Sequence, residues 1–561
     1  MSENKPRRTK KVISIDLGIC STAVACMDDS GENAIVLKLD ENPDPISPTN
    51  GSLMPTVLYF VNETEFYIGE KARRFGLEHP EACIRNFKAD LYRNNQFNYS
   101  GVTAEDGTEL ASIRPIHATN RFLNRLQEKI QLQLLKLFPE KQPFIGKAVL
   151  TVPAKFPVSA KEILKAAAKS VNLPCCLMQE PVAIAIAYLK KYPHIQNKCL
   201  MVYDWGGSSL DISVLRDKSG TLECKDIGGS LPTGGNLLTN IIASDMMREL
   251  NSNYHLEGAK ALPLSPEDYS PDCIHQKQEY LKLYEFVWRW AEHFKIQFSK
   301  KENAQETLHS ETHIFLLPDE DGKLQKVKHI FQRTADNIRL LIENKIEETI
   351  KFTEQKLREA EESGNPVDYL LLAGGSAMIP EVLDKLRQIP KAPEIIVYED
   401  KQDDLSTLIA KGAVQGGLEE IRTQEYLSSD IGIKIRNAGT GFRPPEFQPI
   451  LAYDKKNPKK LPYSNEKPVR VGIQDGCTEY HIMIFERMIQ NTASGTSQNS
   501  NVILAGEFTV ENIPDVPNRI ASYWIQELKD GTLDVSVSIE ADGKSISNSY
   551  TIKKRSNLLD E

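Results

Sequence analysis

Two aspartates in this sequence end short apolar runs, and a glycine turn follows each of them. Asp16 precedes Gly18, and Asp204 precedes Gly206 and Gly207. The backbone N–H groups of such a turn can approach a phosphate closely, and the carboxylate in front of it can serve the magnesium ion of that phosphate. The pattern therefore predicts a site for a nucleoside phosphate and its magnesium.

A third glycine turn, Gly374-Gly375-Ser376, follows the apolar run YLLLA. We expect the two aspartate-led turns to hold a triphosphate from both sides and the third turn to hold the nucleoside end. One such turn alone is more often a tight strand–helix connection, but three in one chain favour nucleotide binding. There is no P-loop, because Ser538 stands where the first glycine would be required ahead of Gly543-Lys544-Ser545.

The elements that must position these turns are strands and helices in alternation. The expected strands are 12–18, 148–154, 199–203 and 369–376. One expected helix opens at Ser159 with Glu162 completing a capping box, a second opens at Glu180-Pro181, and a long third helix covers 334–362. This alternation predicts an α/β architecture in which each of two lobes contributes one aspartate-led turn.

The pattern changes after about residue 420. Residues 421–429 are polar and read as a short linker. Residues 430–554 show short alternating runs separated by Asp-Gly turn signals, such as Asp475-Gly476, and no strong helix signal. We expect this part of the chain to form a small all-β domain.

Composition limits the classes of function. A chain of 561 residues with 40% hydrophobic and 26% charged residues is typical of a globular protein with more than one domain. A net charge of -9 argues against a nucleic-acid partner, and no apolar run could span a bilayer. The nine cysteines lack metal-ligand spacing, which suits reduced thiols in a cytoplasmic protein. His309 and His313 flank Glu311 without the spacing of a zinc site, so we expect surface residues.

The order of the motifs resembles that of the 70-kDa heat-shock chaperones. The motifs are SIDLG, MPTVLYF, YIGEKARR, VLTVPAKF, EPVAIAIAY, VYDWGGSSLDIS and AGGSAMIP. The resemblance covers 12–420 as a two-lobed, actin-like ATPase domain. LAGEFTVENIP and LKDGTLDVSVSIEADGKS resemble the β-sandwich substrate domain of that family. Actin and sugar kinases share the ATPase fold, but we expect them to lack VPAKF followed by EPVAIAIAY and the β-domain.

The resemblance implies roles for individual residues. Asp16 and Asp204 match the carboxylates that organise magnesium, largely through water, and Asp204 also belongs to the catalytic set. Lys88 matches the lysine that positions the attacking water, and Glu180 matches the acid of the hydrolytic site. Glu292, Lys295 and Ser299 match positions that hold ribose and adenine. The other implied nucleotide contacts are Gly18, Ile19, Cys20, Gly206, Gly207, Ser208, Ser209, Gly235, Ile296, Gly374, Gly375, Ser376 and Met378.

Several positions depart from the family's pattern. Ile19 and Cys20 stand where two threonines are usual in the first phosphate loop. Ile296 and Met378 replace two arginines that stack on the adenine, so we expect weaker ATP binding than in arginine-bearing relatives. In the second phosphate loop Ser208 replaces a glycine. Elsewhere, Lys161 replaces an arginine of interdomain signalling and the linker has few apolar residues, and we expect no helical lid after the β-domain.

The sequence thus predicts an ATP-dependent chaperone with ATP or ADP and Mg²⁺ as cofactors. It would hydrolyse ATP slowly and bind extended apolar polypeptide segments through a lidless β-domain, with co-chaperones and a nucleotide-exchange factor as further partners. The alternative is a regulatory or scaffold module in which nucleotide only sets the shape. A third reading, an actin-like filament or a small-molecule kinase, is disfavoured by the β-domain. In the run YHIMIF, Ile482 and Ile484 alternate with Met483 and Phe485, so at least one of these two faces must be core.

Overall fold

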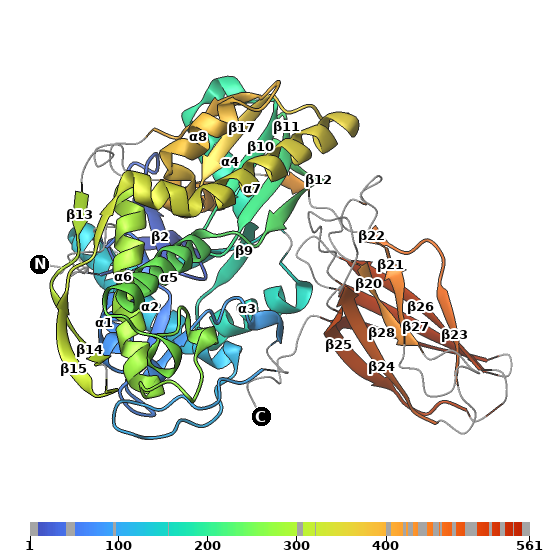
Figure 1. Ribbon diagram of the computed structural model, residues 1–561. Coiled ribbons are helices and arrows are strands. Elements are labelled where there is room, and N and C mark those ends of the chain that lie inside the picture. The colour runs from blue at the N-terminus through green and yellow to red at the C-terminus, as the bar shows by residue number, and fades with distance from the viewer. Residues whose placement is uncertain are drawn as a thin grey trace, which may run out of the picture.

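The structure is a computed structural model of the chain (Figure 1). The described residues are 9–40, 51–93, 97–154, 156–299, 307–319, 321–399, 405–418, 422–424, 430–435, 446–452, 459, 463–473, 478–487, 502–514, 516, 519–527, 533–541 and 544–552. Asp475, Asp530 and most of the predicted linker therefore lie outside the described residues.

The first lobe is built on a sheet with strand order β3-β2-β1-β8-β9. Its strands are β1 (Thr9–Leu17), β2 (Ser21–Met27), β3 (Ala34–Val36), β8 (Pro143–Val152) and β9 (Cys175–Gln179), with β4 (Met54–Pro55) pairing β2. The lobe also contains the helices α1 (Gly69–Glu78), α2 (Pro115–Leu137) and α3 (Val158–Ser170) and the small sheet of β5 (Val57–Phe60), β6 (Phe66–Ile68) and β7 (Cys83–Arg85). β1 is antiparallel to β2 and parallel to β8, so the turn after Asp16 closes a hairpin in the middle of the sheet.

The second lobe repeats this arrangement in the order β12-β11-β10-β17-β18. Its strands are β10 (Cys199–Trp205), β11 (Leu210–Lys218), β12 (Thr221–Leu231), β17 (Tyr369–Ala373) and β18 (Glu394–Ile396). β10 is antiparallel to β11 and parallel to β17, as β1 is to β2 and β8. The shared topology explains why the two lobes each present one aspartate-led glycine turn.

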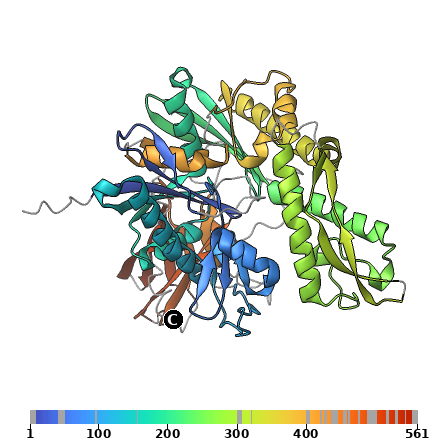
Figure 2. The ribbon, with the colours of Figure 1, turned by 90° about the vertical axis from the view of Figure 1, so that its left-hand side faces the viewer.

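Further elements complete the second lobe on the green to yellow side of Figure 2. The helices are α5 (Gly235–Asn253), α6 (Lys277–Phe298), α7 (Ala335–Glu362) and α8 (Pro380–Arg387), and the short strands are β13 (Thr307–His309), β14 (His313–Pro318), β15 (Leu324–His329) and β16 (Gln332–Thr334). One large buried core unites these helices with the β10–β17 sheet.

Two helices, α4 (Glu180–Lys191) and α9 (Leu408–Leu418), pack against each other between the sheets. A Cβ added at Gly412 would lie 1.7 Å from the backbone oxygen of Ala183, so only glycine allows the helices this close. α4 also packs on β10, and α9 packs on β1, so the pair joins the two lobes.

Most of the strands and helices predicted from the sequence are confirmed, with two corrections. The helix expected to open at Ser159 begins at Val158 with Pro157 as N-cap, and no side chain caps it, so the predicted capping box is wrong. The long helix does open with a capping box, formed by Thr334 and Asn337. His309 is exposed, as expected, whereas His313 is only half-exposed, with its ring stacked on Phe286 at a centroid distance of 3.8 Å.

The all-β part consists of two facing sheets with the orders β21-β20-β24-β25 and β22-β26-β27-β28, with β23 pairing β26. Its strands are β20 (Asp430–Ile435), β21 (Glu446–Leu451), β22 (Tyr463–Ser464), β23 (Val469–Gly472), β24 (Tyr480–Arg487), β25 (Val502–Val510), β26 (Ile520–Glu527), β27 (Leu533–Ala541) and β28 (Lys544–Ile552). Ile482 and Ile484 lie in the core between the sheets, whereas Met483 is 41% exposed. The expectation of a β-sandwich after a two-lobed α/β domain is confirmed.

One segment of the predicted linker differs from expectation. Residues Arg422–Gln424 form a strand, β19, that pairs in parallel with β12 at the edge of the second lobe's sheet. The polar side chains of these residues show no strand pattern in the sequence, because the pairing with β12 uses only backbone groups.

Candidate active site

A cavity of about 750 Å³ lies between the two lobes. Every residue that the sequence analysis assigned to the nucleotide site, from Asp16 to Met378, lines this cavity. These residues come from both central hairpins, from α4, α5 and α6, from the turn after β17 and, for Lys88, from the segment after β7. The structure therefore brings the whole predicted set together, although the role of each residue stays a prediction.

The glycine turns of the two lobes lie close together at one end of the cavity, which we call the inner end. A Cβ added at Gly207 would lie 2.5 Å from the Sγ of Cys20 on the opposite hairpin. Gly374 has φ +82°, and a Cβ there would lie 2.4 Å from the backbone oxygen of Trp205. Only glycine fits these positions without displacing backbone or the facing turn. The Nδ2 of Asn236 donates to the Cys20 Sγ at 3.0 Å, which links the two lobes.

Carboxylates gather beneath these turns around one lysine. The buried Nζ of Lys88 lies 2.9 Å from Oε1 of Glu180, and Thr151 donates to Oδ1 of Asp16 at 2.8 Å. Burial, together with the charge of Glu180, raises the pKa of Asp16 to about 6. Burial and the neighbouring carboxylates also raise the pKa of Asp204 well above its usual value. This excess of negative charge favours the arrival of a cation.

Asp211 is a member of this cluster that sequence reasoning missed. It pairs directly with Asp204 across the β10–β11 hairpin, lines the cavity, and accepts a hydrogen bond of 2.6 Å from Ser209. Its pKa is raised, mainly by burial. The signal was present in the motif VYDWGGSSLDIS, whose second aspartate falls opposite the first once the glycine turn closes a hairpin.

The carboxylates of this cluster suit a magnesium ion that keeps part of its water shell. Among the residues that the structure describes, no group of three or more His, Cys, Asp or Glu side chains is close enough to enclose a metal ion. Asp16, Asp204 and Asp211 are hard oxygen donors that line one space. Such a set suits an ion that keeps several waters and takes further oxygens from phosphate, as Mg²⁺ does in nucleotide sites.

The other end of the cavity is formed by one face of α6 and the turn after β17. Glu292, Lys295, Ile296 and Ser299 all line it, with Met378 from that turn. Lys295 donates to the backbone oxygen of Gly235 at 2.9 Å and to Thr239 at 2.7 Å. Burial lowers the pKa of Lys295. Ile296 and Met378 are half-buried and offer apolar contact to a ring, with no charge.

Two ion pairs cross between the lobes at this end. Arg73 on α1 lies 3.0 Å from Glu292, and Arg85 on β7 lies 2.6 Å from Glu285, both glutamates being on α6. All of these residues line the cavity. These pairs could not be predicted from the sequence, because the partners are 219 and 200 positions apart. The pairs hold the lobes together beside this end of the cavity.

The family described as Hsp70 protein matches this chain over residues 12–431. That span contains both lobes, all of the cavity-lining residues named above and the start of β20. Within the part of the chain that the structure describes, no helix is both long enough and apolar enough to cross a membrane.

Proposed function

This chain belongs to the Hsp70 protein family, whose members act as chaperones and ATPases, and from that premise we propose a specific activity. It hydrolyses ATP in the cavity between its lobes and binds extended apolar polypeptide segments through its β-sandwich. The observation that carries the first half of the proposal is the buried Lys88 in contact with Glu180, among carboxylates and beneath two facing glycine turns.

Each part of the cavity has a role in this proposal. The backbone N–H groups around Gly18 and Gly206 bind phosphate oxygens, and Lys88 places positive charge where the terminal phosphate leaves. Lys88 also positions the attacking water, and Glu180, which accepts a hydrogen bond from Lys88, is the acid of the hydrolytic site. No protein nucleophile is required, because phosphoryl transfer depends on positioning and on stabilising dispersed negative charge.

The same cavity contains the carboxylates that would hold magnesium. Asp16 and Asp204 would hold Mg²⁺, largely through water, and the bound ion would supply positive charge to the phosphate oxygens. Burial, and after it the charge of Glu180, raises the pKa of both carboxylates, so a bound cation would favour their ionised forms. Asp211 acts as a positioning residue, since it fixes the Ser209 hydroxyl beside the turn.

The competing proposal is a regulatory module that binds nucleotide without hydrolysing it. Ile19 and Cys20 favour it, because the first phosphate loop lacks hydroxyl groups at these positions. Single-turnover hydrolysis of ATP by the purified full-length chain separates the two. We expect the parent protein to hydrolyse ATP and Lys88→Ala to abolish this hydrolysis. Nucleotide binding without turnover in the parent protein would favour the regulatory module.

The β-sandwich would supply the client site. We propose the division 12–420 for the ATPase domain, 421–429 for the linker and 430–554 for the substrate domain. A β-sandwich offers main-chain hydrogen bonds and apolar pockets to an extended peptide. If no lid covers the bound peptide, release is fast, and a labelled apolar peptide should dissociate more quickly than from lidded relatives. The absence of binding by any apolar peptide would contradict this part of the proposal.

A further inference from the structure

The end of the nucleotide cavity formed by α6 and the turn after β17, which we call the outer end, offers a base three apolar side chains. Ile296 comes from α6, and Met378 and Ile379 come from the turn. Such side chains contact the faces of an aromatic ring, and every nucleobase has such a face. These contacts therefore contribute affinity without distinguishing one purine from another.

The polar side chains at the outer end are already bound within the protein. The hydroxyl of Ser299 donates to the backbone oxygen of Ile296 at 2.7 Å. The ammonium group of Lys295 donates to two oxygens of α5. The carboxylate of Glu292 is paired with Arg73 at 3.0 Å. A base entering this end thus finds these donors and acceptors engaged with other partners.

The backbone of the turn after β17 is engaged in the same way. The N–H groups of Gly374, Ala377 and Ile379 donate to backbone oxygens at 3.2 to 3.3 Å. The hydroxyl of Ser376 lies 3.5 Å from the backbone oxygen of Gly206, to which it donates. These groups hold the turn in its conformation, so they do not serve the edge of a base.

Adenine and guanine differ only in the donors and acceptors along their edges. A site that hydrogen-bonds such an edge rejects the wrong ligand by about 10⁴-fold or more, because its own buried polar groups lose their partners, whereas an apolar pocket discriminates far less. Ile296, Ser299 and Met378 all remain partly accessible to solvent. The edge of a bound purine can therefore keep hydrogen bonds to water, whichever purine it is.

We propose that the cavity does not distinguish guanine from adenine nucleotides, so that GTP is a substrate alongside ATP. Hydrolysis of GTP rests on the proposed ATPase and extends its substrate class to purine nucleoside triphosphates. The glycine turns and Lys88 line the part of the cavity that receives the phosphates, which both nucleotides share. The base takes no part in phosphoryl transfer, so the same residues serve both substrates.

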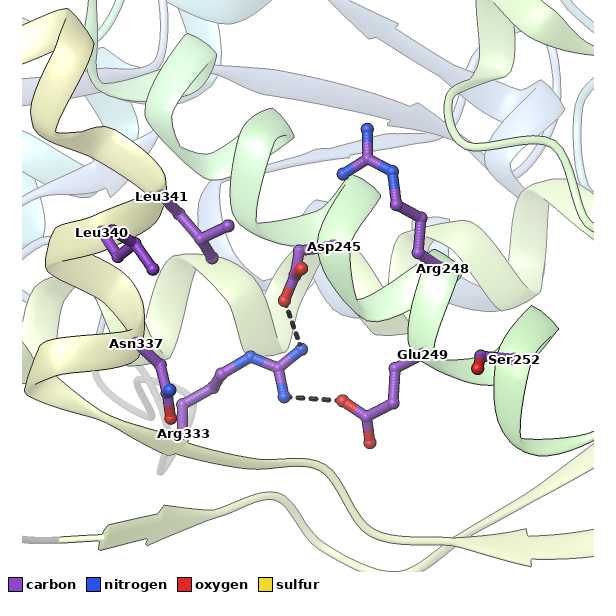
Figure 3. Close-up of a pocket in the computed structure, with 8 residues that line it drawn as sticks. All are labelled: Asp245, Arg248, Glu249, Ser252, Arg333, Asn337, Leu340 and Leu341. Carbon is purple, nitrogen blue, oxygen red and sulfur yellow. Dashed lines mark hydrogen bonds and ion pairs between the residues drawn. The ribbon is translucent and has the colours of Figure 1, made fainter.

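A second hollow, of about 430 Å³, lies between α5 and the beginning of α7 (Figure 3). It shares no lining residue with the nucleotide cavity, and its described lining residues include no glycine. Arg333 binds both of its carboxylates, Asp245 at 2.9 Å and Glu249 at 2.6 Å. This hollow has no glycine turn for a phosphate, so nucleotide binding in solution reports on the cavity between the lobes.

The test is a calorimetric titration of the full-length chain with ADP and with GDP, each with magnesium. The diphosphates avoid turnover during the measurement. We expect the two dissociation constants to lie within about tenfold of each other, since only apolar contacts meet the ring. A larger preference for ADP would overturn the proposal. At saturating nucleotide, ATP and GTP should be hydrolysed at rates within about twofold.

Two variants test how the ring is held. Met378→Ala removes an apolar contact and should weaken ADP and GDP by the same factor, roughly threefold to tenfold. Ser299→Ala removes a hydroxyl and should leave the ratio of the two affinities unchanged. A selective loss of ADP affinity in either variant would overturn the proposal, because it would reveal recognition of the adenine edge. Met483→Ala, at a position 41% exposed in the β-sandwich, is the matched control and should alter neither affinity.

Failure of this proposal and failure of the proposed ATPase give different results. Tight binding of ADP with exclusion of GDP, or hydrolysis of ATP without hydrolysis of GTP, would overturn the shared use of purines and leave the ATPase intact. Equal binding of ADP and GDP without hydrolysis of either triphosphate would contradict the ATPase and still support a base site that does not distinguish the purines.

Discussion

The two ends of the nucleotide cavity differ in the charge of the side chains that line them. The inner end concentrates buried charge, with Lys88 set among Asp16, Glu180, Asp204 and Asp211. The outer end is lined by the uncharged Ile296 and Met378, and ion pairs of α6 glutamates with Arg73 and Arg85 join the two lobes beside it.

This difference separates the chemistry from the recognition of the base. Charge that stabilises phosphoryl transfer must be buried and held in place, and the inner end supplies it. Recognition of the base can be weakened without touching that chemistry, because the base takes no part in the reaction. We therefore expect loss of the inner-end lysine to alter turnover, and changes at the outer end to alter base recognition and nucleotide release but not turnover.

The largest effect should come from Lys88→Ala at the inner end. Loss of one charged transition-state contact is typically worth about a hundredfold to a thousandfold in rate. ATP binding should stay largely intact, since the lysine serves the terminal phosphate. Single-turnover hydrolysis and a parallel ATP titration measure the two effects. A variant that hydrolyses ATP as fast as the parent would show that Lys88 is not the catalytic lysine.

A smaller effect is expected where the lobes meet at the outer end. Arg85→Ala breaks the pair with Glu285 and should speed nucleotide release by roughly threefold to tenfold, a modest value because the Arg85 side chain is 36% exposed. Stopped-flow release of a fluorescent nucleotide measures it. Glu285→Ala should speed nucleotide release by a similar factor, and the double variant should release nucleotide no faster than either single variant.

The control for this prediction is another ion pair. Arg125→Ala removes an exposed pair with Glu128 on α2, away from the cavity. Its release rate should equal that of the parent. If Arg125→Ala and Arg85→Ala change release equally, the effect is one of general surface charge rather than of lobe closure.

The smallest effect is expected from restoring an arginine beside the ring. A guanidinium stacked on an aromatic face contributes about 1 kcal/mol, so Met378→Arg should tighten ATP and adenosine binding by roughly fivefold. The hydrolysis rate at saturating ATP should not change. Met378→Leu keeps apolar contact without charge and serves as the control. An altered turnover rate with unchanged affinity would contradict the view that the outer end affects base recognition but not turnover.

The sequence predicted more of the inner end than of the rest. Asp16, Lys88, Glu180 and Asp204 lie in motifs whose local order already indicates strands and turns, and local order is what a sequence displays directly. Asp211 was missed because its importance appears only when the hairpin register sets it opposite Asp204.

Features that depend on distant partners could not be predicted in this way. The pairs of Arg73 and Arg85 with glutamates on α6 join residues that are far apart in the chain. The strand β19 at Arg422–Gln424 has polar side chains, and only its backbone pairing with β12 defines it. The helix start at Val158 was misjudged because Pro157 ends the preceding segment earlier than the capping signal at Ser159 suggested.

The most direct test of the account is a calorimetric titration of adenosine, ADP and ATP, each with and without magnesium. If the inner end holds the nucleotide, ATP should bind well with magnesium and be released when the ion is chelated, while adenosine alone should bind barely at all. Tight adenosine binding that is independent of magnesium would contradict the account, because it would assign the affinity to the pocket of Ile296 and Met378 rather than to the phosphate turns.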